Sequence, residues 1–188
     1  MLASHSGVLL LILMLVVTYR AYRSSTFLNL KCVIAGSNGK KYCVRDRSRI
    51  NEAANLLAKT AETLQTIVDS AYQKYPGRSN CVRLKDNFNP KAIEETLPTS
   101  ELTAYSENKG EKLAFCLSKK SKTSEQLIDG NTLLFVAIHE LAHIATVSVG
   151  HTEEFWDNFR FLLHHAEAIG VYTPIDYSLN PRSYCGMR

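Results

Sequence analysis

The segment Thr132–Val147 constrains this chain most, because it is strongly apolar and still carries three ionisable side chains. Its apolar residues recur at the three- and four-residue spacing of a buried helix. His139 and His143 lie four positions apart and project from one face of that helix, with Glu140 about 100° away around the axis. Unpartnered polar groups are costly to bury, so the fold must supply these three with a partner.

A single metal ion would satisfy all three side chains. Two histidines four residues apart can bind one zinc ion, and a glutamate between them in H-E-x-x-H is typical of a general base. Glu140 would then take a proton from a water molecule on the zinc. The structural alternative is a pair of hydrogen-bonded core histidines beside a salt-bridged glutamate.

A catalytic zinc ion keeps three protein ligands and one open position. His151 is the predicted third ligand, because Gly150 lets the chain reverse after the helix. Glu154 is the alternative, one turn into the following helix. We therefore expect His139, His143 and His151 to bind Zn²⁺, with Glu140 as the catalytic residue.

The remaining pattern predicts an α+β fold with a small antiparallel sheet. The expected helices are a long N-terminal one over 48–75, the metal helix after an N-cap at Asn131, and a C-terminal helix Glu153–Ala168 between a Thr152 cap and Gly170. The first of these would begin at a cap from Asp46 or Ser48. The expected strands are a hairpin within Lys31–Val44, then Cys81–Leu84, Leu102–Ser106 and Lys112–Leu117, with 85–99 as loop.

The N-terminus contains an uncharged apolar run, Gly7–Tyr19, followed by Arg20 and Arg23. It predicts a membrane anchor over 1–23, a linker over 24–30 and one domain over 31–188. The positive-inside rule would then place the domain in the cytoplasm, at a virion or host membrane if the protein is viral. A signal peptide and a buried core helix are the alternatives.

Charge and cysteine content bound the function further. The net charge of +4 is too mild for a nucleic-acid signature, so no specific nucleic acid partner is expected. The five cysteines form no C-x-x-C pair. Cys32 and Cys43 flank the expected hairpin and could pair in an oxidising compartment, but an odd count favours reduced thiols.

Other polar and aromatic residues near the C-terminus have weaker patterns. His164 and His165 are expected on the surface of the last helix. Tyr172, Tyr177 and Tyr184 are expected as packing residues, any one of which could instead donate a phenol hydrogen bond to an oxyanion. Phe155 and Trp156 are expected in the core.

The motif H-E-x-x-H followed by Gly150-His151-x-x-x-Phe155 resembles the SprT-like and WLM zinc metallopeptidases. With the tail Tyr184-Cys185-Gly186-Met187, the region also resembles uncharacterised metallopeptidases of large DNA viruses. The resemblance implies a zincin-like domain that cleaves peptide bonds. The seven-residue spacer between His143 and His151 departs from the usual spacings of these families.

Together these features predict a zinc endopeptidase acting on a protein or peptide substrate. The substrate is expected to pair with the edge of a strand, either Leu102–Ser106 or Lys112–Leu117. The alternatives are a DNA-associated protease of the SprT or WLM kind, and a non-catalytic zinc-stabilised module of a membrane or virion.

Overall fold

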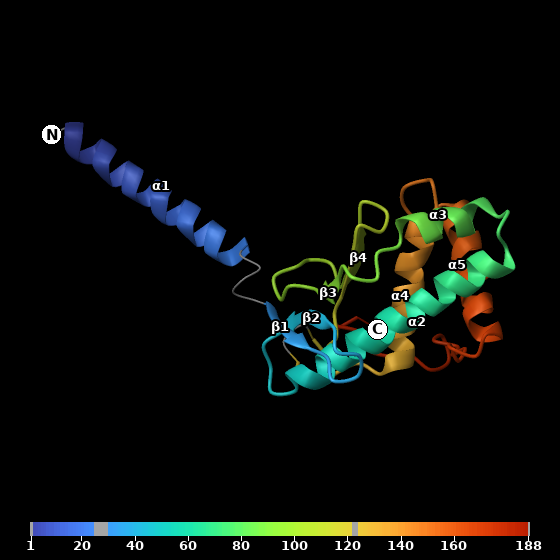
Figure 1. Ribbon diagram of the computed structural model, residues 1–188. Coiled ribbons are helices and arrows are strands. Elements are labelled where there is room, and N and C mark those ends of the chain that lie inside the picture. Colours follow the sequence, from blue (N-terminus) through green and yellow to red (C-terminus); the bar gives the residue numbers. More distant parts are fainter. Residues whose placement is uncertain (1, 25–29, 122–123, 188) are drawn as a thin grey trace.

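The computed structural model describes residues 2–24, 30–121 and 124–187, and it has the expected α+β architecture (Figure 1). Its elements are α1 (Leu2–Ser24), β1 (Leu30–Ile34), β2 (Lys41–Arg45), α2 (Ile50–Lys74), α3 (Ser79–Asn87), β3 (Ile93–Glu95), β4 (Ala104–Glu107), β5 (Lys112–Phe115), α4 (Gly130–Ala145) and α5 (Glu153–Ala168).

The described strands form a hairpin of β1 and β2 and a three-stranded sheet in the order β3-β5-β4. In that sheet β4 is antiparallel to β5, as expected, but β3 is parallel to β5. The parallel β3 thus departs from the small antiparallel sheet that the sequence predicted, whereas the β1–β2 and β4–β5 pairs agree with it. The segment expected as loop supplies β3, which is too short and too acidic to show a strand pattern. The central position of β5 leaves β4 as an edge strand.

Buried charge joins the hairpin to this sheet. Glu95, fully buried at the end of β3, accepts a hydrogen bond from the backbone N–H of Arg45 at 2.8 Å and forms ion pairs with the side chains of Arg45 and Arg47. Arg45 Nε also donates to the carbonyl of Thr96 at 2.8 Å. A buried carboxylate is tolerated here because it is paired and hydrogen-bonded.

One predicted strand and two predicted helix caps needed correction. Cys81–Leu84 belongs to α3 and not to a strand, because its apolar residues face α2 and α4 at helical spacing. The N-cap of α4 is Asp129 and not Asn131: the Asp129 carboxylate accepts from Thr132 N at 2.9 Å and from the Thr132 hydroxyl at 2.8 Å. At α2 the N-cap is Arg49, which makes no side-chain capping bond.

Helix α4 lies at the centre of the domain and contacts α2, α3, α5 and the sheet (Figure 1). It begins and ends within two residues of the expected helix. The C-terminal helix α5 has the predicted bounds, and the Thr152 side chain caps it at Phe155 N. Gly170, with φ +75°, follows the end of α5 as the sequence predicted.

The expectation of reduced thiols was wrong, because Cys32 bonds to Cys43 and Cys116 bonds to Cys185. Cys32 and Cys43 are directly opposite each other in the β1–β2 register. The second pair joins β5 to the C-terminal tail. Cys81 is buried and free among the described residues, which accounts for the odd count.

The apolar N-terminal segment forms α1, whose side chains over 7–21 are exposed (Figure 1). The predicted single-pass anchor, with its membrane partner and location, was wrong: no helix in the described part of the chain is long and apolar enough to cross a membrane. As a helix, Gly7–Tyr19 rises only about 20 Å, against a hydrocarbon core of about 30 Å. Residues 25–29 of the expected linker lie outside the described residues, so the proposed domain division stays a prediction.

The turn between β4 and β5 adopts an unusual backbone. Asn108, Lys109 and Gly110 all have positive φ, at 45°, 57° and 117°. A Cβ atom at Gly110 would lie 2.5 Å from the carbonyl oxygen of Asn87 and 3.1 Å from Ile144 Cδ1. The turn is therefore packed directly against the end of α3 and the side of α4.

We predict that Gly110→Ala lowers the free energy of unfolding by about 3 kcal/mol, combining left-handed strain with the clash against the Asn87 backbone. Gly39→Ala is the matched control, because Gly39 has φ +70° and an added Cβ atom there would meet nothing within 4 Å. It should cost only about 1 kcal/mol. Urea unfolding of both variants measures the difference, and equal losses would contradict the close packing of the turn.

Candidate metal centre

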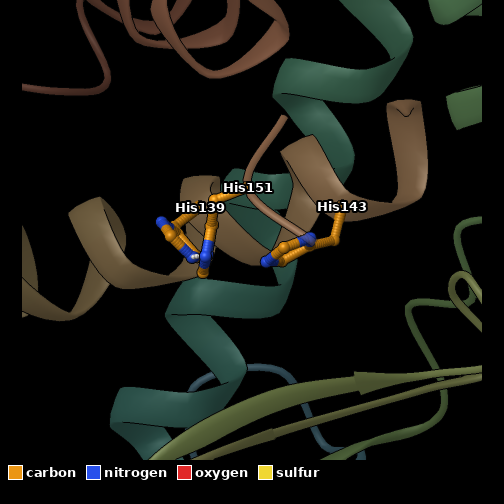
Figure 2. A group of neighbouring side chains, drawn as sticks. All are labelled: His139, His143 and His151. Carbon is orange, nitrogen blue, oxygen red and sulfur yellow. Dashed lines mark hydrogen bonds between the residues drawn. The ribbon is translucent and has the colours of Figure 1, made fainter. Parts of the chain in front are cut away.

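The three predicted histidines come together at one point (Figure 2). His139 and His143 extend from one face of α4, and His151 returns from the loop after it. One ring nitrogen from each lies within 4.8 Å of the others, and His139 Nε2 is 3.0 Å from His151 Nε2. Gly150, with φ +85°, makes the chain reversal that the sequence predicted.

This donor set suits zinc. Three imidazole nitrogens are typical ligands of a catalytic zinc ion, and they leave a fourth position open. Burial and the neighbouring imidazoles lower the pKa of His139 to about 4, and burial with the nearby His151 and Lys109 does the same for His143. Both rings are therefore neutral at pH 7, with a lone pair available for a metal. Their role as ligands stays a prediction.

The aromatic ring of Phe155 packs against all three imidazoles. The Phe155 ring is fully buried, and its centroid lies 4.8 Å from that of His139, 4.4 Å from His143 and 4.7 Å from His151. Trp156 stacks on the outer side of His151 at 5.7 Å. The sequence predicted both aromatics in the core, which holds for Phe155 but not for Trp156, whose exposed fraction is 42%.

Glu140 lines the same cleft but is not part of the histidine cluster. Its side chain is buried, and this burial raises the pKa of the carboxyl group to about 7. A carboxylate that is poorly solvated and close to its proton donor is suited to act as a general base near neutral pH. This placement beside the histidines is the one that the helical spacing predicted.

Glu154, the alternative third ligand, faces the loop and not the histidines. Its carboxylate accepts from Val147 N at 2.9 Å and from Ser148 N at 3.1 Å, and also from the Ser148 hydroxyl. These bonds lower its pKa to about 2. Of the two candidates, His151 is the residue that reaches the cluster.

The cleft has a volume of about 460 Å³ and lies between α4 and the edge strand β4. Its walls come from β4, the β4–β5 turn, α4 and the loop before α5: Ala104, Tyr105, Ser106, Asn108, Lys109, His139, Glu140, His143, Val149, Gly150 and His151. Sequence reasoning missed Tyr105 and Lys109 as cleft residues. Only the juxtaposition of β4 with α4 places them there.

None of the three C-terminal tyrosines lines the described cleft. Tyr184 is buried, its hydroxyl donates to the carbonyl of Thr103 at 3.0 Å and accepts from Cys116 N at 3.2 Å. Tyr172 is also buried, and neither it nor Tyr177 lines the cleft. Their packing role is thus favoured over oxyanion binding.

The two neighbouring histidines of α5 differ. His164 is exposed, as expected, whereas the prediction for His165 was wrong. His165 is buried, with its Nε2 atom 2.8 Å from the Ser70 hydroxyl. It faces α2, on the side of α5 that packs into the core.

We predict that the purified full-length chain binds about one zinc ion and that His151→Ala removes most of it, because two ligands hold zinc far more weakly than three. His164→Ala is the control, since this exposed imidazole lies outside the cluster. Metal content measured by atomic emission after desalting decides the matter. Full zinc retention in His151→Ala would remove His151 from the ligand set.

Viral proteins resemble this chain in sequence. An uncharacterized protein of Acanthamoeba polyphaga mimivirus is 29% identical over 152 residues, which cover 79% of this chain and 76% of that protein. Uncharacterized proteins of invertebrate iridescent viruses 6 and 3 are 39% and 41% identical over 57 and 58 residues. These shorter matches cover 30% and 31% of this chain, and 32% and 36% of the two relatives. No family model matches the chain.

Two solved structures of Wss1 from Saccharomyces cerevisiae also show similarity to this chain. The crystal structure of Wss1 matches with a TM-score of 0.48 and 18% identity, over 67% of this chain and 86% of that one. A Wss1 mutant matches with the same score and identity over 69% and 92%. The expected likeness to viral proteins is thus confirmed, whereas membership of the WLM or SprT-like families stays a prediction.

Proposed function

We propose that this chain is a zinc-dependent endopeptidase. The observation that carries the proposal is the convergence of three imidazoles beside a buried glutamate, in a cleft bounded by an edge strand. His139, His143 and His151 would hold the ion, and Glu140 would act as the general base. The open fourth position and the separate glutamate favour catalysis over a purely structural zinc site, which normally has four protein ligands.

When bound, zinc would supply a Lewis acid that polarises a carbonyl group and makes a water molecule more acidic. Glu140 has the complementary task of accepting a proton from that water and passing it to the leaving amine. Its buried carboxyl group, with a pKa raised to about 7, has the proton affinity for both steps. Phe155 keeps water away from the rear of the imidazoles.

The edge strand β4 is the proposed binding site for the substrate backbone. Strand β5, the alternative from the sequence, is excluded because it is paired on both sides by β3 and β4. Ala104, Tyr105 and Ser106 of β4 line the cleft opposite the histidines. An extended peptide that adds to this edge would pass directly over the proposed metal position.

The charge of the cleft favours a peptide ligand. Lys109 is the one cationic lysine or arginine among the described lining residues, and its ammonium group is engaged with backbone carbonyls. The cleft offers no row of basic side chains for a phosphate backbone. A DNA-associated protease would have to contact DNA through another face.

Glu140→Gln is expected to lower peptide hydrolysis by about 10²–10⁴-fold, because glutamine keeps the size of the side chain but cannot accept the proton. Zinc content should stay at the wild-type level, since no ligand is removed. Casein digestion and metal analysis on the same preparation test both parts.

Glu167→Gln, at an exposed glutamate in the last turn of α5 that does not line the described cleft, controls for loss of a carboxylate. Wild-type activity in Glu140→Gln would contradict the peptidase proposal. Loss of zinc from Glu140→Gln would instead assign Glu140 to metal binding.

A further inference from the structure

We propose that Lys109 and Glu154 are positioning residues that grip the segment Thr146–Ser148 from two sides and so preset His151 for metal binding. The inference rests on the proposed zinc site and adds two residues outside its ligand set. Lys109 comes from the β4–β5 turn and Glu154 from the first turn of α5. The gripped segment connects the end of α4 to the loop that carries His151.

Lys109 holds the carbonyl side of this segment. Its Nζ atom donates to the carbonyl oxygens of His143 at 3.2 Å, Thr146 at 2.8 Å and Ser148 at 2.8 Å. An ammonium group has three donors, and three acceptors surround it here. Carbonyl groups in the last turn of a helix lack intrahelical partners, so a cation at this end also stabilises α4.

Glu154 holds the amide side of the same segment. It accepts from the backbone N–H groups of Val147 and Ser148 and from the Ser148 hydroxyl, at 2.9, 3.1 and 2.8 Å. Ser148 is therefore fixed by both residues, through its carbonyl by Lys109 and through its amide and hydroxyl by Glu154. The cationic Lys109 therefore binds carbonyl groups of the segment, and the anionic Glu154 binds its N–H groups.

The segment has little apolar packing to hold it otherwise. The exposed fractions of Val147 and Val149 are 65% and 88%, so these side chains contribute little burial energy. Thr146 is buried and accepts a hydrogen bond from Asn158 Nδ2 at 2.9 Å, and the Ser148 and Thr152 hydroxyls are 2.6 Å apart. The contacts of Lys109 and Glu154 add the charged part of the hydrogen bonding that fixes the path from α4 to His151. This distinguishes the two residues from ordinary surface charges, whose ion pairs add little to stability.

The backbone of Lys109 points to the same role. Asn108 and Lys109 are non-glycine residues with positive φ, a conformation that costs on the order of 1 kcal/mol or more at each position. Such strain persists where the surroundings impose it, and here it directs the ammonium group toward the end of α4. Because the turn also connects β4 to β5, Lys109 links β4, the strand proposed to bind the substrate, to the loop that carries His151.

If the grip is removed, the loop samples more conformations and His151 lies within reach of the metal for a smaller fraction of the time. The apparent metal affinity is the intrinsic affinity multiplied by that fraction, so it falls. In known sites, residues that support metal ligands contribute about 10–100-fold to metal affinity. We expect an effect of the same order here.

The test measures zinc affinity of the full-length chain by competition with a chromophoric chelator. Glu154→Ala and Lys109→Met are each expected to weaken binding about 10–100-fold. Glu153→Ala is the matched control for the first, because Glu153 is exposed in the same helical turn. Lys91→Met, at an exposed lysine, is the control for the second. Ser148→Ala removes the hydroxyl and with it the side-chain contacts to Glu154 and Thr152, and keeps both backbone bonds to Glu154 and Lys109. It should weaken binding by several-fold without endangering the fold.

The unfolding temperature of the zinc-free variants separates positioning from general stability. The proposal expects zinc affinity to fall in Glu154→Ala and Ser148→Ala while the folded zinc-free proteins persist at the assay temperature. Unchanged affinity in folded Glu154→Ala and Ser148→Ala, beside a wild-type chain that binds zinc, would overturn the grip and leave the zinc site standing. A wild-type chain that binds no zinc would instead overturn the proposed function itself.

Discussion

The burial of α4 is the constraint on which the rest of the structure depends. The helix contacts α2, α3, α5 and β4, so most of its circumference is apolar and enclosed. Its polar ends must be satisfied within the protein, and they are. Asp129 caps the first turn, and the hydroxyl of Thr146 donates to the carbonyl of Ala142 at 2.7 Å near the last. A buried chain of amides from α3 and α5, Asn80 to Asn158 to Thr146, completes that end.

Enclosure on the other sides leaves one sector of α4 facing the cleft, and that sector carries the ionisable residues. The low dielectric of the surrounding core keeps the imidazoles of His139 and His143 neutral and raises the proton affinity of Glu140. The same burial that stabilises the helix therefore sets the protonation states that the proposed chemistry needs. Burial is thus the common cause of the stability of α4 and of these protonation states.

The sequence predicted what depends on local signals. Helix α5 has a strong cap at Thr152 and a glycine stop, and its bounds were found correctly; the histidine cluster followed from helical spacing and from Gly150. The missed features depend on contacts distant in sequence. Cys81–Leu84 is too short a segment to distinguish a strand from a helix by its pattern. Strand β3 depends on its pairing with β5 and on the contact of buried Glu95 with Arg45. The role of Lys109 is likewise invisible locally, since a lysine in a turn looks like a solvated charge.

The bond between Cys116 and Cys185, at a sequence separation of 69, closes a covalent ring that contains α4, α5 and all three histidines. The tail between α5 and Cys185 is part of this ring and is largely exposed, with Leu179 at 77%. Exposed tails of this kind are preferred sites of proteolytic nicking. A cut there would leave both pieces joined by the disulfide bond. Tyr184 would keep its hydrogen bonds to Thr103 and Cys116, and the strand edge beside the cleft would keep its support.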